Sequence, residues 1–429
     1  MHSRLLLVQG HLLLLLLIVI TALFETTESL SDRPVVAPPS ATAENRISDY
    51  KEVEATSSPS TAISTQTETT SFVAMPSIAP EDSYLVNDPL PEMPLLPITS
   101  EATVRACRAM KISSRDVFVC SYPKSGTTWT QNIVVRLLWE IASGNSDHPL
   151  PEDWHLSHSA PFYEVDQYWR RSQKDSKSTS DNHDEEESME RLAAQTPIRN
   201  ENENEYRVFN THLLPHQLPK NAKCVYVVRD PLDVMVSFYH HLSNQAVEDG
   251  GFTGTFEEFF EGFLEGTIVY GKWQDHIEAW LGNGVVVDGT DKERNFLLLH
   301  YEDMKEDLAR ETKRLVKFLS DEDDESSEDR YLDELVSRVV PQCTFDAMKR
   351  ERKRYTPLTV SWKVNPKTGK PYDEFVRKGT IGDGRKLVLE TPSSSSSALK
   401  DRWTDQDTPI AKARWNNAGV EQDIIDRYL

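Results

Sequence analysis

Ser121-Tyr122-Pro123-Lys124-Ser125-Gly126-Thr127-Thr128-Trp129 is the stretch that decides the fold of this chain. The apolar run 116–120 leads into it and has the length and β-branched content of a buried strand. Apolar residues then recur at helical spacing from Trp129 to Ile141, and Gly144 is a candidate C-cap. A strand, a tight turn and a helix N-terminus in succession direct backbone N–H groups and the positive end of the helix dipole at one point. The stretch therefore predicts an anion site.

The spacing of this stretch excludes the phosphate loop of nucleoside triphosphatases, G-x-x-x-x-G-K-[ST], because its glycine follows the lysine. The nine residues instead resemble the 5′-phosphosulfate loop of the cytosolic-type sulfotransferases, Y-P-K-S-G-T-T-W. That family uses 3′-phosphoadenosine 5′-phosphosulfate (PAPS) as sulfuryl donor and needs no metal. The resemblance implies that the cofactor is bound by Lys124, Ser125, Gly126, Thr127, Thr128 and Trp129.

A second block lies where the apolar strand 224–228 ends. Arg229 follows the strand, Asp230-Pro231 is a typical helix start, and Ser237 comes two helical turns later. Each residue alone would be read as a surface charge or a helix serine. Together, residues 225–240 resemble the family's 3′-phosphate segment, which implies that Arg229 and Ser237 hold the 3′-phosphate of PAPS. The planar fork of an arginine suits a phosphate dianion.

A third block, residues 375–383, resembles the family's R-K-G-x-x-G-D-W-K loop. The resemblance implies that Arg377, Lys378 and Gly379 close over the 3′-phosphate. Gly384 stands where the family usually has a tryptophan. For adenine the family uses stacked aromatic rings, and Trp129, Phe345 and Tyr301 match those positions, although each ring alone would more often belong to the core.

His212 is the predicted catalytic base. It ends a short strand in Thr211-His212-Leu213-Leu214-Pro215, which resembles the family's K-T-H-L-P segment. Sulfuryl transfer to a hydroxyl group needs a base that works near neutral pH, and histidine meets that need. Asn210 replaces the family's lysine. The implied mechanism is a direct in-line transfer in which Lys124 stabilises charge on the leaving oxygen.

Strands alternate with helices along the folded part. Strands are expected around 116–120, 206–212, 224–228 and 295–300. Helices are expected around 127–143, 231–241 and 256–281, and another follows residues 301–305 and ends near residue 319. This order predicts an α/β fold with a doubly wound, mostly parallel central sheet, flanking helices and ligands at the carboxyl ends of the strands. The sulfotransferase domain is expected at residues 93–429, with an acidic surface loop inserted near residues 172–205.

The net charge of −22 is concentrated in residues 1–100, 172–205 and 321–334, which together account for all of it. The remainder is neutral overall, so a local anion site is compatible with the composition, while a nucleic-acid partner is not expected. The four cysteines are scattered without a C-x-x-C pair, so neither a disulfide framework nor a zinc site is expected.

Two N-terminal segments precede the expected domain. Residues 5–24 are apolar apart from Gln9, Gly10 and His11, and no clear cleavage site follows them. We interpret residues 1–24 as a signal-anchor or signal-like segment that attaches the chain to a membrane, with a cytoplasmic protein as the alternative. Residues 25–92 are rich in Ser, Thr and Pro and predict a disordered stem.

The sequence thus predicts a PAPS-dependent sulfotransferase that acts on a phenol or alcohol of a small acceptor. Phe162 and Tyr239 are the candidate acceptor-binding residues. A Golgi carbohydrate sulfotransferase is an alternative suggested by the N-terminal segment and stem, although its phosphosulfate loop would differ. A non-catalytic scaffold that binds 3′-phosphoadenosine 5′-phosphate (PAP) is the alternative outside the enzymes. The residues do not identify the acceptor or the oligomeric state.

Overall fold

The structure, a computed structural model, describes residues 93–143, 149–171, 189–191, 197–200, 203–282, 295–320, 328–372, 375–390 and 394–429. Its centre is a five-stranded sheet in the order β4-β5-β1-β6-β7. These strands are β1 (Asp116–Ser121), β4 (Ile198–Arg199), β5 (Glu205–Thr211), β6 (Lys223–Val228) and β7 (Phe296–His300). Two small two-stranded sheets pair β2 (Trp169–Arg171) with β3 (Met189–Arg191) and β8 (Val364–Asn365) with β9 (Lys370–Pro371).

The central sheet is parallel except at one edge. β1 pairs in parallel with β5 on one side and with β6 on the other, β6 pairs in parallel with β7, and β4 runs antiparallel to β5. The chain leaves β1 for β5 and then crosses to β6, so the strand order reverses at β1. The carboxyl ends of neighbouring strands at such a reversal frame the usual ligand crevice of an α/β sheet. The predicted mostly parallel, doubly wound sheet is confirmed.

Side chains of β1 alternate between two apolar cores, one on each face of the sheet. Phe118 and Cys120 belong to a core built with α2, α5, α6, α7, α15 and α16, whereas Val117 and Val119 belong to a core built with α3, α10, α11 and α12. Every residue of β1 is buried. A strand covered on both faces reads as a continuous apolar run, which is why the sequence signal at this strand is strong.

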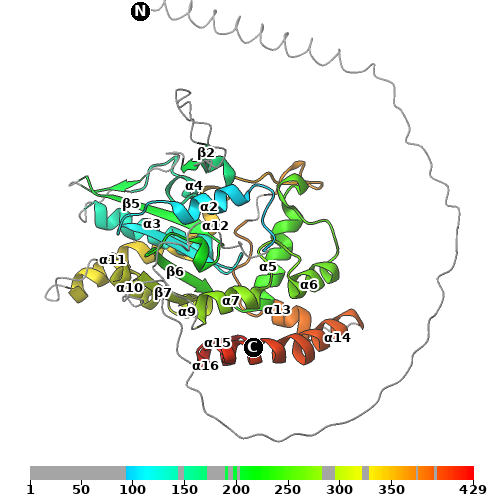
Figure 1. Cartoon of the computed structure of the whole chain (residues 1–429). Helices are drawn as coiled ribbons and strands as arrows, with labels where there is room; N and C mark the ends of the chain where they lie inside the picture. The colour runs from blue at the N-terminus through cyan, green and yellow to red at the C-terminus, as the bar shows by residue number, and fades with distance from the viewer. Residues whose placement is uncertain are drawn as a thin grey trace, which may run out of the picture. The chain divides into compact units, whose positions relative to one another are not determined.

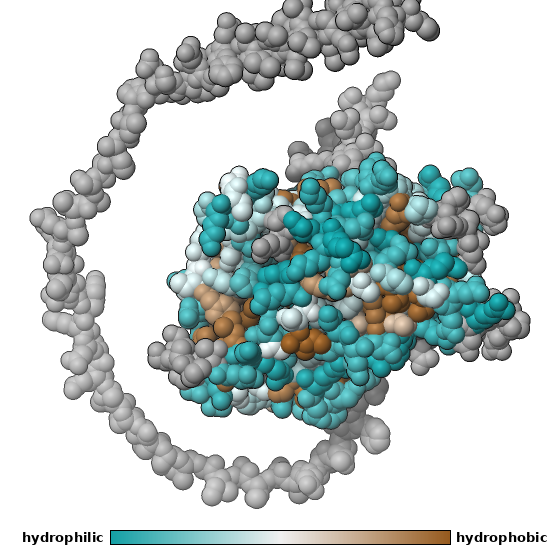
Figure 2. Space-filling view, turned by 180° about the vertical axis from the view of Figure 1, so that it is seen from behind, coloured by the Kyte–Doolittle hydropathy of each residue, from teal (hydrophilic) through white to brown (hydrophobic). Residues whose placement is uncertain are grey.

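The helices surround the sheet as Figure 1 shows, with the C-terminal helices α13–α16, in orange and red, lying beside α6 and α7. Their bounds are α2 (Glu101–Ala109), α3 (Thr127–Ala142), α4 (Leu156–Ser159), α5 (Pro231–Asn244), α6 (Phe256–Glu265), α7 (Trp273–Leu281), α9 (Tyr301–Glu306), α10 (Leu308–Leu319), α11 (Glu328–Cys343), α12 (Phe345–Arg350), α13 (Asp383–Arg385), α14 (Ser394–Asp401), α15 (Thr408–Ala418) and α16 (Gln422–Tyr428). Figure 2 shows the opposite face as mostly hydrophilic, with separate hydrophobic patches.

Two expectations about secondary structure were wrong. The helix expected over residues 256–281 is two helices, because Gly266 caps α6 in the left-handed conformation and Tyr270 and Gly271 also have positive φ. The acidic insertion expected near 172–205 is not all loop, since β3, β4 and the start of β5 fall inside it. Ile198 of β4 is buried in the core on the α3 face, which explains why that end pairs with the sheet.

The predicted N-terminal segment and stem, residues 1–24 and 25–92, lie outside the described residues. Among the helices that the structure does describe, none combines the length and the apolar character required to cross a membrane.

Candidate active site

One cavity opens where β1 and β6 end, and most of the predicted site residues line it. Ser121 of β1 is the register partner of Val227 of β6, so the turn after β1 and the residue after β6 are neighbours in space. The predicted residues that line the cavity are Lys124, Gly126, Thr127, Thr128, Trp129, Phe162, His212, Arg229, Ser237, Tyr301, Phe345, Arg377, Lys378 and Gly379. The three sequence blocks, far apart in the chain, therefore share one cavity.

The turn between β1 and α3 is tight and has an unusual backbone. Lys124 and Gly126 both have positive φ, 69° and 114°. A Cβ at Gly126 would lie 2.8 Å from the ring of Tyr301, so this position needs glycine for conformation and for space. α3 begins at Thr127, whose Oγ1 is 2.6 Å from Ser121 Oγ. The first N–H groups of α3 have no partner within the helix and are available to an anion.

Ser125 does not line the cavity, unlike the other predicted cofactor-binding residues between Lys124 and Trp129. It is fully buried, and its Oγ finds no hydrogen-bond partner among the residues that the structure describes. Buried hydroxyl groups are seldom left without a hydrogen-bond partner. The turn thus keeps one hydrogen-bonding group, Ser125 Oγ, that the described part of the protein does not use.

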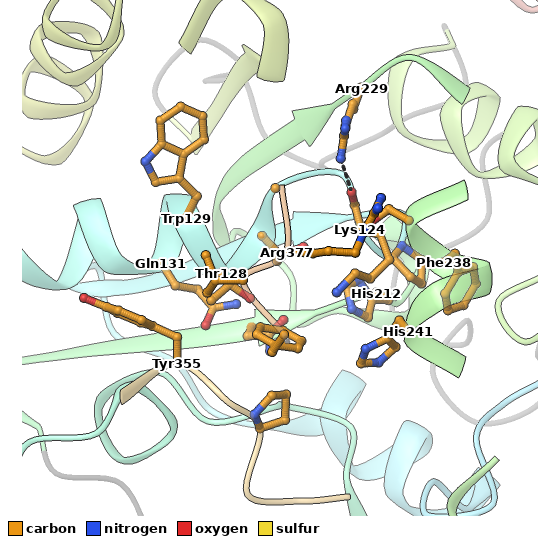
Figure 3. A pocket seen from close by; sticks show the side chains of 18 of the residues that line it. Lys124, Thr128, Trp129, Gln131, His212, Arg229, Phe238, His241, Tyr355 and Arg377 are labelled. Carbon is orange, nitrogen blue, oxygen red and sulfur yellow. Dashed lines mark hydrogen bonds between the residues drawn. The ribbon is translucent and has the colours of Figure 1, made fainter. Parts of the chain in front are cut away.

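Three cations gather at the strand ends. Arg229 Nη1 donates to the carbonyl oxygen of Lys124 at 3.3 Å, as the dashed line in Figure 3 marks, and Figure 3 places Arg377 in the same group. Burial, Arg229 and Arg377 lower the pKa of Lys124 to about 7. Holding three like charges together is unfavourable unless an anion joins them. The arrangement is therefore suited to a ligand that carries several negative charges.

The chain itself fixes the position of Arg229. Its Nη2 donates to the carbonyl oxygen of Thr380 at 3.0 Å and to Asp233 Oδ2 at 3.5 Å, and its guanidinium lies 4.3 Å from the centre of the Tyr301 ring. Nε is buried and has no partner within the described part of the chain. Asp233 also accepts from the backbone N–H groups of Gly382 and Gly384, which ties the third sequence block to the start of α5.

The predicted aromatic rings lie together at one side of the cavity. Trp129 and Tyr301 pack edge to face with ring centres 5.5 Å apart, and Trp129 Nε1 donates to the carbonyl oxygen of Cys343 at 2.6 Å. Lys305 Nζ lies 6.0 Å from the Trp129 ring and 5.4 Å from the Phe345 ring. Trp129 and Phe345 thus offer flat faces near one another, as stacking of a nucleobase requires.

His212 follows β5, and its imidazole faces the cavity (Figure 3). Its Nδ1 lies 2.7 Å from the carbonyl oxygen of Ser121, which can only accept, so Nδ1 carries the proton and Nε2 keeps its lone pair. The rings of Phe162 and Tyr270 hold the imidazole from its sides at 5.3 and 5.1 Å. Burial and, to a smaller extent, the charge of Lys124 lower the pKa of His212 to about 4, so the imidazole is a neutral base at pH 7.

Three residues that the sequence reasoning did not single out position His212. The backbone N–H of His212 donates to Glu164 Oε1 at 2.8 Å, and its carbonyl oxygen lies 3.1 Å from His276 Nε2. Tyr270 also donates to Glu164 Oε1, at 3.5 Å. Burial raises the pKa of Glu164 to about 7. The periodicity of α7 marks His276 only as a core residue, and neither Glu164 nor Tyr270 stands in a recognisable motif.

The two predicted acceptor-binding residues have different positions. Phe162 lines the cavity beside His212, whereas Tyr239 does not line it. The Tyr239 ring packs against Phe252, Phe256 and Phe259, with centres 5.3–6.3 Å away. The structure thus places Tyr239 in the packing between α5 and α6 and not on the wall of the cavity.

The residues that the structure describes form no candidate metal site. Across the described ranges, no group of three or more His, Cys, Asp or Glu side chains comes together in a way that could hold a metal ion. All four cysteines are free and buried.

Comparisons with known proteins identify the same region. The family model described as Sulfotransferase domain matches residues 114–391. Sulfotransferase 1C2 of Rattus norvegicus is 32% identical over 282 residues, covering 64% of this chain and 78% of the relative. Amine sulfotransferase of Oryctolagus cuniculus is 32% identical over 284 residues, covering 64% and 75%. Sulfotransferase 1E1 of Mus musculus is 30% identical over 299 residues, covering 68% and 81%.

Among solved structures, a mouse sulfotransferase complexed with PAP is similar, with 21% sequence identity and a TM-score of 0.44. The match covers 73% of this chain and 90% of that one.

Proposed function

Because the chain belongs to the sulfotransferase family, we propose that it transfers a sulfuryl group from PAPS to a hydroxyl group of a small acceptor. The observation that carries this proposal is the convergence of Lys124, Arg229 and Arg377 on the cavity that His212 also faces. The buried Nε of Arg229, which has no partner among the described residues, supports an anionic ligand at this place. PAPS carries an activated sulfuryl group on its 5′-phosphate and a second, separate phosphate at its 3′ position.

Each block of the chain has a role in this proposal. The turn at residues 124–129 and the N-terminus of α3 hold the 5′-phosphate end. Arg229, Ser237 and the loop with Arg377, Lys378 and Gly379 hold the 3′-phosphate. Trp129, Tyr301 and Phe345 hold the adenine by stacking. In this structure Lys378 Nζ is 3.2 Å from Asp383 Oδ2, an exposed ion pair that a phosphate can replace at little cost.

His212 acts as the general base. Its Nε2 takes the proton of the acceptor hydroxyl as the acceptor oxygen bonds to sulfur. The bond from sulfur to the bridging phosphate oxygen breaks, and Lys124 stabilises the charge that develops on that oxygen. The hydrogen bond from His212 Nδ1 to the Ser121 carbonyl oxygen stabilises the imidazolium that results, because an imidazolium donates from both nitrogens.

The acceptor end of the cavity favours an uncharged aromatic or apolar hydroxyl compound. It is lined by Leu96, Phe162, Phe238, His241, Leu242, Val269, Tyr270, Val360 and Phe375. Among the described lining residues, the carboxylates are Asp233 and Asp383, which lie at the phosphate end. A cationic amine would find no carboxylate on the described cavity wall at the acceptor end, so we propose phenols and alcohols as acceptors.

The test is PAP-agarose binding followed by transfer of radiolabelled sulfate to a panel of phenols, alcohols and carbohydrates. We expect His212→Ala to keep PAP binding and to lower the turnover rate by at least about a hundredfold. Lys124→Ala should also abolish transfer while the protein stays folded.

Robust turnover in either variant contradicts the role assigned to that residue. PAP binding with no transfer to any acceptor would favour the non-catalytic scaffold. Transfer to carbohydrates alone would favour the carbohydrate sulfotransferase.

A further inference from the structure

His241 lies in the acceptor end of the cavity but has no part in the proposed transfer. It is on α5, one helical turn after Ser237, and lines the cavity near Lys124 and His212 (Figure 3). The rings of Trp362 and Phe375 meet its imidazole edge to face at 5.3 and 5.6 Å. Its orientation is therefore set by packing before any acceptor binds.

Phe375 connects His241 to the reacting centre. The Phe375 ring contacts His241 on one side and lies 4.2 Å from Lys124 Nζ. Figure 3 shows His241 and His212 on the same part of the cavity wall beside Lys124, so an acceptor that reaches His212 also meets His241. Burial, Lys124 and His212 all lower the pKa of His241, so its imidazole is uncharged at neutral pH. A neutral imidazole presents one hydrogen-bond donor and one acceptor.

The acceptor end of the cavity offers more hydrogen-bonding groups than a single hydroxyl group of an acceptor can use. The imidazole of His241 makes no hydrogen bond in the described part of the chain, in contrast to the imidazoles of His212 and His276. Asn210, two residues before His212, also lines the cavity, and its buried Oδ1 has no partner among the described residues. A polar group left without partners in an aromatic pocket weakens the binding of an acceptor that cannot bond to it.

We propose that His241 is a specificity-determining residue that hydrogen-bonds a second polar substituent beside the reacting hydroxyl group, so that the acceptors are uncharged catechol-type compounds. The inference rests on the proposed function, because it takes His212 as the base for the first hydroxyl group. A simple phenol would leave the His241 imidazole unpaired. A catechol satisfies both histidines, with one hydroxyl group at His212 Nε2 and the adjacent one at His241.

The experiment compares two acceptors that differ by one hydroxyl group. 4-Methylphenol and 4-methylcatechol are titrated into the full-length protein saturated with PAP, and binding is measured by calorimetry. We expect the catechol to bind about five- to tenfold more tightly, which is the usual effect of one hydrogen bond between neutral groups. His241→Phe should bring the ratio of the two affinities, catechol to phenol, close to one. His241→Gln, which keeps a hydrogen-bonding group, should restore part of it.

Two further variants locate the effect. His158→Phe changes a histidine that does not line the cavity, and it should leave the ratio unchanged. Asn210→Leu removes the other unpartnered polar group. A ratio that collapses in Asn210→Leu but survives in His241→Phe overturns the assignment to His241.

The two hypotheses fail in distinguishable ways. If no acceptor is sulfated, the proposed function fails, while the binding ratio still decides the role of His241. If PAP does not bind, the same titrations are made without it. Equal affinity of the wild-type protein for both compounds overturns the inference. If His241→Phe does not fold, as judged by circular dichroism, the comparison of His241→Gln with His241→Leu replaces it.

Discussion

Two titratable side chains at the site have pKa values near 7, one lowered and the other raised to this value. Lys124 is buried beside Arg229 and Arg377, which disfavours its ammonium form. Glu164 is buried under His212, which disfavours its carboxylate form. Both shifts follow from the same cause, the removal of an ionisable group from water, and each leads to a measurable dependence on pH.

Lys124 should make PAP binding depend on pH. The anion favours the ammonium form, and above pH 7 most of the free protein must take up a proton to reach that form. We expect PAP affinity to fall between pH 7 and pH 9, by up to about tenfold per pH unit. The PAP phosphates are already ionised in this range. Calorimetry in two buffers of different ionisation enthalpy measures the proton uptake directly.

Lys124→Met should abolish this proton uptake, while Lys353→Met, at an exposed position, should not change it. Affinity that is constant from pH 7 to pH 9 in the wild-type protein would show that Lys124 is already protonated in the free state.

Glu164→Gln should stabilise the protein at alkaline pH. The pKa of Glu164 rises from an ordinary value of 4.5 to about 7 in the folded state, so folding favours the protonated form. Stability is therefore lost as pH rises from 4.5 through 7, where the buried group ionises. Glutamine stays neutral and can still accept from the His212 N–H. We expect the free energy of unfolding to increase by about 3 kcal/mol at pH 8 and to change little at pH 4.5.

Urea unfolding at both pH values checks this expectation. An equal change at pH 4.5 and pH 8 would point to packing instead of ionisation as the cause.

At the scale of elements, the start of α5 joins two blocks of the site. Asp230 caps α5 by accepting from the N–H groups of Leu232 and Asp233, and its other carboxylate oxygen lies 2.7 Å from Arg385 Nε. Asp233 binds Arg229 and the backbone of the loop at Gly382 and Gly384. The C-terminal loop thus reaches the phosphate end of the cavity through its contact with one helix terminus.

Gly384→Ala should therefore weaken cofactor binding. A Cβ at this position would overlap the backbone of Leu232 and Asp233, so the loop with Arg377 and Lys378 could not dock as it does. We expect PAP affinity to fall at least about tenfold, since charged hydrogen bonds to phosphate would be lost.

The control is Gly369→Ala in the hairpin of β8 and β9. Gly369 also has positive φ, 64°, but a Cβ there meets no atom within 4 Å. It should cost only backbone strain, of roughly 1–2 kcal/mol, and leave PAP affinity unchanged. Equal loss of affinity in both variants would mean that general destabilisation, not loop docking, is responsible.

For the molecule as a whole, the folded domain should be independent of the N-terminal segments. A compact unit spans Glu81–Leu429. We expect a chain that begins at residue 81 to melt within a few degrees of the full-length protein and to bind PAP equally well, as thermal shift with and without PAP would measure. A truncated chain that aggregates or fails to bind PAP would contradict this expectation.

Where the protein resides is a separate question for residues 5–24. If they form the predicted signal-anchor, a fluorescently tagged full-length chain should sediment with membranes, and deletion of residues 1–30 should release it. A full-length chain that stays in the cytosol would instead support the cytoplasmic alternative.

The sequence by itself determined the family and the mostly parallel, doubly wound character of the sheet. The turn after β1, Arg229 after β6 and the loop at Arg377 are short continuous segments, and such segments can be read because their neighbours in sequence are also their neighbours in space. The parallel sheet could be predicted for the same reason, since the strands are apolar runs buried on both faces. The family model and the strand order agree with both predictions.

Only the tertiary structure decided which side chains surround His212. Glu164 and His276 are 48 and 64 residues away from it in sequence, and Tyr270 reaches it because glycines interrupt the expected helix between α6 and α7. The same packing turned Tyr239 away from the cavity and His241 into it. Helical periodicity distinguishes a buried face from an exposed one, but a cavity wall and a core are both buried. The difference between them depends on what the rest of the chain packs against that face.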